Sequence, residues 1–451
     1  MYPDVHLTRP WRRGIMVSLI LTFFILAPAL IFYTAGYRYN FATHQIEQTG
    51  VISIDAQPRD VEVTLDTITF EKKMPLRITN IRPGAYHLTM SKEGFHTWEK
   101  DIRVTSRQTT YIRDVLLPRI ARPEPLIFEE WDEGQNIETV LPSPDGRYII
   151  IVTTKQEMYE VFLFDTDRQR LTLLIRTLPQ KLPIISWSPT GRVVFIGTKT
   201  ESGTELRVLD MPDTNTFATA TTTASLENIR YQWLKRVLGS PTLFFQEKNI
   251  LYQLTQQGKR NIAVSTSTKW FVETEDSIWT TTDTPYLFLY DGKGNLRTSL
   301  PLPEIATDIV DITPAHFILQ SERGIMVLRR NENLITDSQL LSVHTIRFFP
   351  QINTWIAWSS QEIWGIKDDG NAELLNRTGE TIRTLTTFDT FGVLAVAMGQ
   401  SLQVFNPGYF VSQELTRGWT IDVLHVNPKE QKIYFLSSDG EGKQRLYTLM
   451  Y

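Results

Sequence analysis

Three patterns of hydrophobic and polar residues follow one another along the chain. Residues 14–35 form an uncharged and almost entirely apolar run, GIMVSLILTFFILAPALIFYTA. Residues 50–117 alternate between apolar and polar positions with a period of two, between Pro and Gly turns. From residue 125 onwards, short apolar runs that end in polar turns recur about every 40 residues. These patterns predict a membrane-spanning helix, a small β-structure and a long repeated β-structure.

The apolar run 14–35 is long enough to cross a bilayer, because its 22 residues reach about 33 Å at about 1.5 Å per residue. Positive charge is concentrated before it: Arg9, Arg12 and Arg13 precede the run, and only Arg38 follows closely. The positive-inside rule therefore predicts a single-pass protein of the cytoplasmic membrane, with residues 1–13 in the cytoplasm and the rest outside it. Residues 36–49 would form a juxtamembrane segment.

A cleaved signal peptide is the competing interpretation of this run. Ala27-Pro28-Ala29 provides small residues at a plausible cleavage spacing. The run continues through Leu30-Ile31-Phe32, which favours an uncleaved signal-anchor. We therefore expect residues 14–35 to have the lipid bilayer as their partner.

The alternating segment 50–117 indicates a small antiparallel sheet or sandwich. Its turns carry a family resemblance through Gly50-Val51-Ile52-Ser53-Ile54, Pro58, Met74-Pro75-Leu76, Ile81-Arg82-Pro83-Gly84-Ala85-Tyr86 and Lys92-Glu93-Gly94-Phe95. These sequences resemble a PEGA domain, a small β-sandwich common in exported and envelope proteins. Arg59-Asp60-Val61 and Asp66-Thr67 depart from the family's usual turns. The resemblance implies a spacer or binding module without a catalytic set.

The repeated C-terminal pattern contains eight modules. If each apolar run is the third strand of its module, these strands end at residues 165, 210, 255, 291, 330, 368, 406 and 450. A period near 40 residues is expected of a β-propeller, because a single four-stranded sheet cannot bury both its faces alone. The sequence predicts an all-β fold behind the helix, with an eight-bladed propeller over 125–451. Seven blades are the alternative if one weak middle repeat is an insertion.

The first two modules share a turn. Ser143-Pro144-Asp145-Gly146 and Ser188-Pro189-Thr190-Gly191 lie 45 residues apart. They resemble the PD40 repeat of TolB-like, WD40-like propellers, in which this turn joins the inner two strands. Asn427-Pro428-Lys429-Glu430 is interpreted as a degenerate copy in the last module. Thr214 to Ser225 is interpreted as the edge strand of the second blade, with a glycosylated or disordered tip as the alternative.

The last module is one strand short. It supplies strand-like runs at 421–426, 432–437 and 445–450. Before the first module, Pro125 to Trp131 (PLIFEEW) has strand character and follows a proline-containing linker, 118–124. We predict that PLIFEEW pairs outside the final strand, because this would close the ring and remove an exposed edge.

Little in the sequence indicates chemistry. There is no cysteine, the net charge is −4 without a basic stripe, and the seven histidines are scattered singly: His6, His44, His87, His96, His316, His344 and His425. We therefore expect neither thiolate chemistry nor a nucleic-acid partner. No nucleophile elbow, zinc helix, phosphate loop or calcium loop is present. No catalytic, cofactor-binding or metal-binding residue is assigned, and no enzyme is predicted.

Two sets of residues allow a structural and a functional interpretation. Asp291–Asn295 and Asp368–Asn371 are interpreted as hairpin turns rather than calcium sites, because no distal bidentate Glu follows. Eight tryptophans are expected to pack between blades, with a carbohydrate platform as the alternative: Trp187, Trp233, Trp270, Trp279, Trp355, Trp358, Trp364 and Trp419.

The combined prediction is a membrane-anchored, extracytoplasmic recognition or scaffold protein of the cell envelope. It would bind a protein or glycan through the propeller, since rigid scaffolds present binding loops without needing reactive clusters. The alternative is an envelope polysaccharide hydrolase or lyase with carboxylates assembled in the propeller channel.

Overall fold

The computed structural model describes residues 9–451 except 35, 41–44, 129–130, 132–134, 157, 178–180, 202, 212, 235–240, 265–268, 333 and 439–441. His6, His44, most of the predicted cytoplasmic tail and Glu129-Glu130 of PLIFEEW lie outside the described residues. The chain divides into two compact units, residues 1–120 and 121–451. Each unit is considered by itself below.

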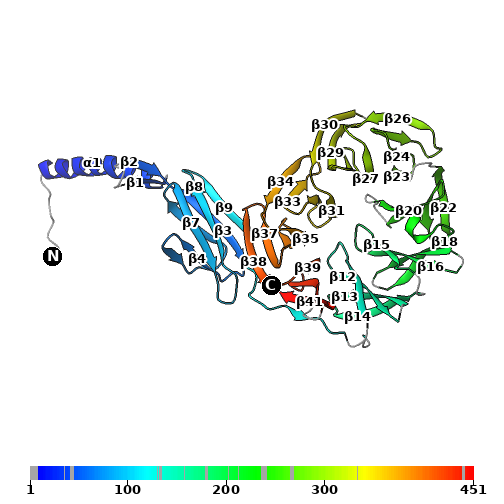
Figure 1. Ribbon diagram of the computed structural model, residues 1–451. Coiled ribbons are helices and arrows are strands. Elements are labelled where there is room, and N and C mark those ends of the chain that lie inside the picture. The colour runs from blue at the N-terminus through cyan, green and yellow to red at the C-terminus, as the bar shows by residue number, and fades with distance from the viewer. Residues whose placement is uncertain are drawn as a thin grey trace, which may run out of the picture. The chain divides into compact units, whose positions relative to one another are not determined.

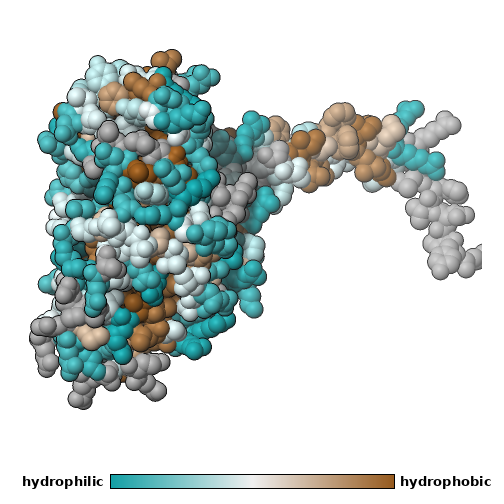
Figure 2. Space-filling model, turned by 90° about the vertical axis from the view of Figure 1, so that its right-hand side faces the viewer, coloured by the Kyte–Doolittle hydropathy of each residue, from teal (hydrophilic) through white to brown (hydrophobic). Residues whose placement is uncertain are grey.

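The first unit begins with one long apolar helix, α1 (Arg9–Thr34). The most apolar 18-residue window within Pro10–Thr34 has a mean hydropathy of 2.7 and is 0% buried, so apolar surface is open along the helix (Figure 2). Length and composition suit a membrane span, and they would equally suit a signal sequence. A short hairpin follows, made of β1 (Tyr37–Asn40) and β2 (Gln45–Gln48).

The rest of the first unit is a sandwich of two sheets with the orders β6-β3-β9 and β5-β4-β7-β8. The strands are β3 (Gly50–Gln57), β4 (Glu62–Leu65), β5 (Ile68–Phe70), β6 (Leu76–Ile81), β7 (Gly84–Ser91), β8 (Trp98–Val104) and β9 (Thr109–Leu116). The predicted alternation is confirmed, since Val61, Val63 and Leu65 are all buried. One pair, β3 with β9, is parallel rather than antiparallel.

The connection between the units is shorter than the predicted linker 118–124. Residues 118–120 bond back to the sandwich: the His96 N–H donates to the Pro118 carbonyl and the Ile120 N–H to the Gly94 carbonyl. Glu124 is already part of a propeller strand. Residues 121–123 therefore lie between the two structures.

Within the described residues, the second unit consists of eight four-stranded sheets arranged as a ring (Figure 1). The predicted eight-bladed propeller is confirmed and the seven-bladed alternative is wrong. In blades 1 to 7, the strands follow chain order from the innermost outwards, each antiparallel to the next. The third strands end at residues 165, 210, 255, 290, 331, 366, 406 and 450, each within two residues of its predicted end.

Blades 1 to 4 contain the first sixteen of these strands. Blade 1 is β11 (Asn136–Pro142), β12 (Tyr148–Lys155), β13 (Met158–Asp165) and β14 (Arg170–Arg176); blade 2 is β15 (Ile184–Trp187), β16 (Val193–Thr200), β17 (Gly203–Asp210) and β18 (Asn215–Thr222). Blade 3 is β19 (Tyr231–Leu234), β20 (Thr242–Glu247), β21 (Ile250–Thr255) and β22 (Gly258–Val264); blade 4 is β23 (Lys269–Thr274), β24 (Ser277–Thr281), β25 (Tyr286–Tyr290) and β26 (Leu296–Pro301). A 3-10 turn, Leu226–Asn228, precedes blade 3. The edge strand predicted from Thr214 to Ser225 is confirmed as β18.

Blades 5 to 8 complete the ring. Blade 5 is β27 (Ala306–Ile312), β28 (His316–Ser321), β29 (Gly324–Asn331) and β30 (Leu334–Leu341); blade 6 is β31 (Thr345–Phe349), β32 (Thr354–Trp358), β33 (Glu362–Ile366) and β34 (Ala372–Arg377). Blade 7 is β35 (Ile382–Thr387), β36 (Leu394–Met398), β37 (Ser401–Asn406) and β38 (Val411–Arg417); blade 8 is β39 (Ile421–Asn427), β40 (Lys432–Ser438), β41 (Gln444–Met450) and β10 (Glu124–Pro125).

The turns expected between strands are present. Ser143 accepts a hydrogen bond from the Tyr148 N–H at 2.9 Å, and Ser188 accepts one from the Val193 N–H at 3.1 Å, so each serine fixes the turn between the first two strands of its blade. Gly146 and Gly191 have φ of +83° and +73°, which glycine adopts at little cost. In blade 8 the Asn427 side chain accepts hydrogen bonds from the Lys429 and Glu430 N–H groups, in the turn between the first two strands of that blade.

The ring is closed by the segment before blade 1. Glu124 and Pro125 pair with Thr448 and Tyr447 of β41, and the Leu126 N–H donates to the Leu446 carbonyl at 2.8 Å. The predicted closing strand is confirmed, but it begins one residue earlier and is shorter than PLIFEEW. The next residues pack instead of pairing: Phe128 joins a buried cluster with residues of blades 1 and 8.

Polar side chains join blade 8 to blade 1 at this seam. Asn427 donates to the Thr166 hydroxyl at 2.7 Å, and Lys429 forms an ion pair of 2.6 Å with Asp167. His425 Nε2 lies 2.9 Å from the Gly146 carbonyl and must donate to it, because a carbonyl only accepts. Burial lowers the pKa of His425 to about 3. The imidazole is therefore neutral in the folded chain.

We expect His425 to make the fold acid-sensitive. Between its unfolded pKa of 6.5 and its folded pKa of about 3, the unfolded chain binds a proton at this position and the folded chain does not, so the free energy of unfolding falls as the pH is lowered. His425→Gln should flatten this dependence in denaturant unfolding between pH values of about 4 and 7, relative to unchanged protein and to His344→Gln at an exposed position. Equal slopes in all three proteins would contradict the assignment.

Candidate functional site

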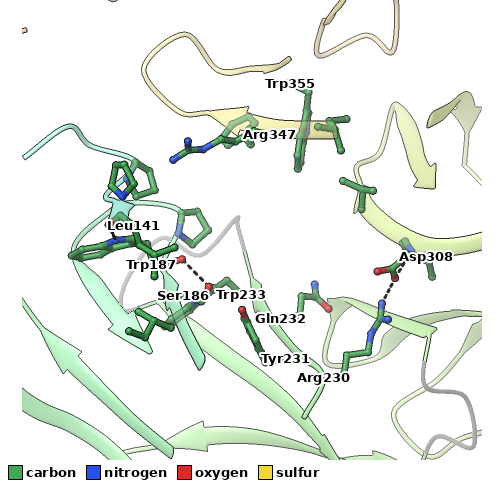
Figure 3. A pocket seen from close by; sticks show the side chains of 18 of the residues that line it. Leu141, Ser186, Trp187, Arg230, Tyr231, Gln232, Trp233, Asp308, Arg347 and Trp355 are labelled. Atoms are coloured by element: carbon green, nitrogen blue, oxygen red, sulfur yellow. Dashed lines mark hydrogen bonds and ion pairs between the residues drawn. The ribbon is translucent and has the colours of Figure 1, made fainter. Parts of the chain in front are cut away.

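The innermost strands of all eight blades line one cavity on the propeller axis. Its volume is about 840 Å³, and lining residues come from β11, β15, β19, β23, β27, β31, β35 and β39. Cavities of roughly 300–1,000 Å³ are typical of small-ligand sites, and they are usually apolar with a few polar groups. This cavity is the candidate functional site (Figure 3).

Aromatic rings form much of its wall, and the indole N–H groups of four tryptophans are already bonded. Indole N–H groups donate from one blade to the blade before it: Trp187 to the Leu141 carbonyl at 2.9 Å, Trp233 to the Ser186 hydroxyl at 3.2 Å, Trp270 to Gln246 at 2.7 Å and Trp355 to Asp311 at 2.9 Å. The rings therefore hold neighbouring blades together while part of the ring surface lines the cavity.

The tryptophans mainly serve packing, as predicted. Five of the eight are buried, namely Trp233, Trp270, Trp279, Trp355 and Trp358, while Trp187, Trp364 and Trp419 are partly buried. Packing does not prevent a role in the site, because Trp187, Trp233, Trp270 and Trp355 also line the cavity. The sequence alone could not separate these two contributions.

Two aspartates reach the cavity, and each is engaged by an arginine. Asp308 of blade 5 forms an ion pair with Arg230 of blade 3, whose guanidinium also donates to the Trp270 carbonyl at 3.3 Å. Asp422 of blade 8 forms an ion pair with Arg383 of blade 7. These carboxylates serve as partners for arginines that link different blades.

Arg347 is the cavity's other arginine, and it is placed differently. It extends from β31 into the cavity on the side of Trp187 and Leu141, away from the Arg230–Asp308 pair (Figure 3). Its guanidinium lies 5.6 Å from the centre of the Phe349 ring. The described part of the chain offers it neither a hydrogen-bond acceptor nor an ion-pair partner, and burial lowers the pKa of Arg347.

One end of the channel is crossed by a contact between distant turns. Gln351, in the turn after β31, donates to the Pro144 carbonyl in the turn after β11. Pro142, Pro144 and Pro189 line the cavity near these turns. Arg347 also reaches a small second cavity that is lined by Gly146, Thr387 and His425.

The acidic hairpins are turns, as predicted. Asp291 accepts from the backbone N–H groups of Lys293 and Asn295 at 2.9 and 2.8 Å, and Asp369 accepts from the Asn371 N–H at 2.9 Å. Across the residues that the structure describes, no three His, Asp or Glu side chains are grouped so that they could hold a metal ion. No site residue was assigned from the sequence, so Arg347 was not anticipated. The tryptophans of the aromatic wall were considered there only as an alternative carbohydrate platform.

The inter-blade indole bonds should contribute to stability. Trp187→Phe removes the donor to the Leu141 carbonyl and should lower the free energy of unfolding by about 1 kcal/mol. Trp364→Phe is the matched control, because Trp364 donates to Glu362 of its own strand. This substitution should lower the free energy of unfolding by roughly half as much or less. Denaturant unfolding compares the two, and an equal or larger loss for Trp364→Phe would contradict the inter-blade role.

Comparison with known proteins identifies one part of the chain. Residues 49–119 match the PEGA domain family, which confirms the resemblance found in the sequence. No curated protein matches the chain.

Solved structures resemble the propeller only distantly. The Dos1 propeller has 12% identity and a TM-score of 0.46, covering 73% of this chain and 95% of its own. An uncharacterized protein from Listeria monocytogenes has 11% identity and a TM-score of 0.43, covering 67% and 98%. The AfRom2 CNH domain has 9% identity and a TM-score of 0.37, covering 73% and 99%. At these values the likenesses carry no inference about function, and the TolB-like character of the propeller stays a prediction.

Proposed function

We propose that this chain is a membrane-anchored recognition protein of the cell envelope that binds its ligand without turnover. Helix α1 would be the anchor, since its apolar surface is entirely exposed and arginines precede its uncharged part. The PEGA domain at 49–119 would act as a spacer outside the cytoplasm, and the propeller would present the binding site.

The observation that carries the proposal is the aromatic cavity of about 840 Å³ on the propeller axis. Exposed ring surface, a free guanidinium and few other polar groups suit the binding of a ligand that is partly apolar. The carboxylates of Asp308 and Asp422 are each held by an arginine. This arrangement gives the hydrolase or lyase alternative less support, since such an enzyme needs one carboxyl group free to act as an acid.

Capture of an envelope partner tests this proposal. The full-length chain in detergent should retain a specific partner from envelope extract, and Phe348→Ala should reduce its retention at least tenfold, because Phe348 lines the cavity. Phe391→Ala is the matched control: this phenylalanine is 67% exposed in the turn between β35 and β36, away from the lining residues.

The variants that lose the partner distinguish binding in the cavity from binding on the propeller face, and a cleavage assay distinguishes binding from turnover. Loss of the partner with Phe391→Ala, together with its retention by Phe348→Ala, would show that the partner binds the propeller face and not the cavity. Cleavage of an envelope polysaccharide by the purified chain, abolished by Asp422→Asn, would contradict binding without turnover.

A further inference from the structure

We propose that the propeller cavity binds a peptide ligand through its carboxylate, with Arg347 as the residue that holds this group. The inference rests on the proposed function, since it specifies the ligand of the same cavity. It is carried by the charges on the cavity wall, by the unused hydrogen-bonding groups and by the apolar surface around them.

The charges of the wall leave one cation without a counterpart. Arg230 and Asp308 neutralise each other, and Asp422 is neutralised by Arg383 next to the cavity. Arg347 remains, and the described residues provide no anion for it. The site is therefore complementary to a ligand that brings a single negative charge.

A carboxylate is the group that best fits this single guanidinium. A planar guanidinium can donate two parallel hydrogen bonds to a carboxylate, and in a partly buried site such a pair is stronger than in water. A phosphate group carries more charge and is usually met by several cations or by a helix N-terminus. Nothing of that kind lines the described wall of this cavity.

The remaining polar groups favour a peptide over a glycan. Gln232 is occupied on both sides, because it accepts from the Val272 N–H at 2.8 Å and donates to the Val272 carbonyl at 3.2 Å. The indole donors are likewise used between blades. Among the described lining residues, the hydroxyls of Tyr231 and Thr384 have no hydrogen-bond partner.

A sugar chain would bring many hydroxyl groups into this cavity and leave most of them unpaired, which is unfavourable away from water. A peptide end brings one carboxylate, a few amide groups and apolar side chains. The rings of Trp187 and Phe348 offer such side chains a surface.

The test uses the immobilised full-length chain in detergent and two pools of short peptides of randomised sequence without Asp or Glu. The pools differ only at the end, which is a free carboxylate in one and an amide in the other. We expect the carboxylate pool to be retained at least tenfold better. Arg347→Gln should abolish this difference and Arg347→Lys should keep part of it, because lysine retains the charge but not the planar pair of donors.

Two controls separate binding from folding. Arg170→Gln removes an exposed arginine in the outermost strand of blade 1 and should behave like unchanged protein. Arg347→Gln should melt like unchanged protein, since no described residue depends on Arg347 for a hydrogen bond.

Equal retention of the two pools would overturn the inference. So would a uronic-acid oligosaccharide that is retained through Arg347 while the peptides are not. If neither pool is retained although partner capture still requires Phe348, the carboxylate assignment fails and the proposed function stands. If Arg347 retains carboxylate peptides but capture does not require Phe348, the inference is supported and the cavity is wrong as the site of the captured partner.

Discussion

The propeller depends on one short strand pairing. Blade 8 draws three of its strands from the C-terminal part of the chain, and β10 supplies the fourth by pairing with β41. This pairing joins a segment that precedes blade 1 to the last strand of the chain, so the two ends of the propeller sequence are hydrogen-bonded to each other. The same segment places Phe128 in a buried cluster with residues of blades 1 and 8, so main-chain pairing and apolar burial close the ring together.

Closure also determines what the channel can offer a ligand. Because each blade buries its faces against its neighbours, the inner strands are held by contacts between blades, including the indole bonds and the Arg230–Asp308 and Arg383–Asp422 pairs. These contacts use most polar groups of the wall for structure. The few groups that remain, Arg347 foremost, therefore determine which ligand fits.

The fold could be predicted from the sequence, because a propeller repeats its pattern. The third strands of the blades are short apolar runs before polar turns, and they predicted eight blades, with seven left as the alternative. Blade 8 has only three strand-like runs in the C-terminal part of the sequence, and one further run precedes blade 1. This count predicted that the early run completes blade 8 and closes the ring. The length of β10 was not predictable, since hydrophobic character does not distinguish residues that pair in a sheet, such as Leu126, from those that only pack, such as Phe128.

The site could not be predicted in the same way. The repeat places Arg347 in the first strand of blade 6, but successive side chains of a strand point to opposite faces, and a shift of one residue exchanges them. Whether an arginine finds a carboxylate in a neighbouring blade also depends on contacts between residues far apart in the chain, such as Arg230 and Asp308. The turn at Asp66-Thr67 shows a similar limit in the PEGA domain: Asp66 adopts a φ of +52° where the family usually has an Asp-Gly turn.

The closure of the ring can be tested directly, because the chain contains no cysteine. Glu124 and Thr448 are paired residues of β10 and β41, and directly opposed residues lie close enough for a disulfide. Glu124→Cys with Thr448→Cys should form an intramolecular disulfide on mild oxidation, seen by non-reducing peptide mapping. Glu124→Cys with Gln444→Cys, displaced by about 13 Å along the strand, should not. Failure of the first pair to cross-link, or equal cross-linking of both, would contradict the closed ring on which the channel depends.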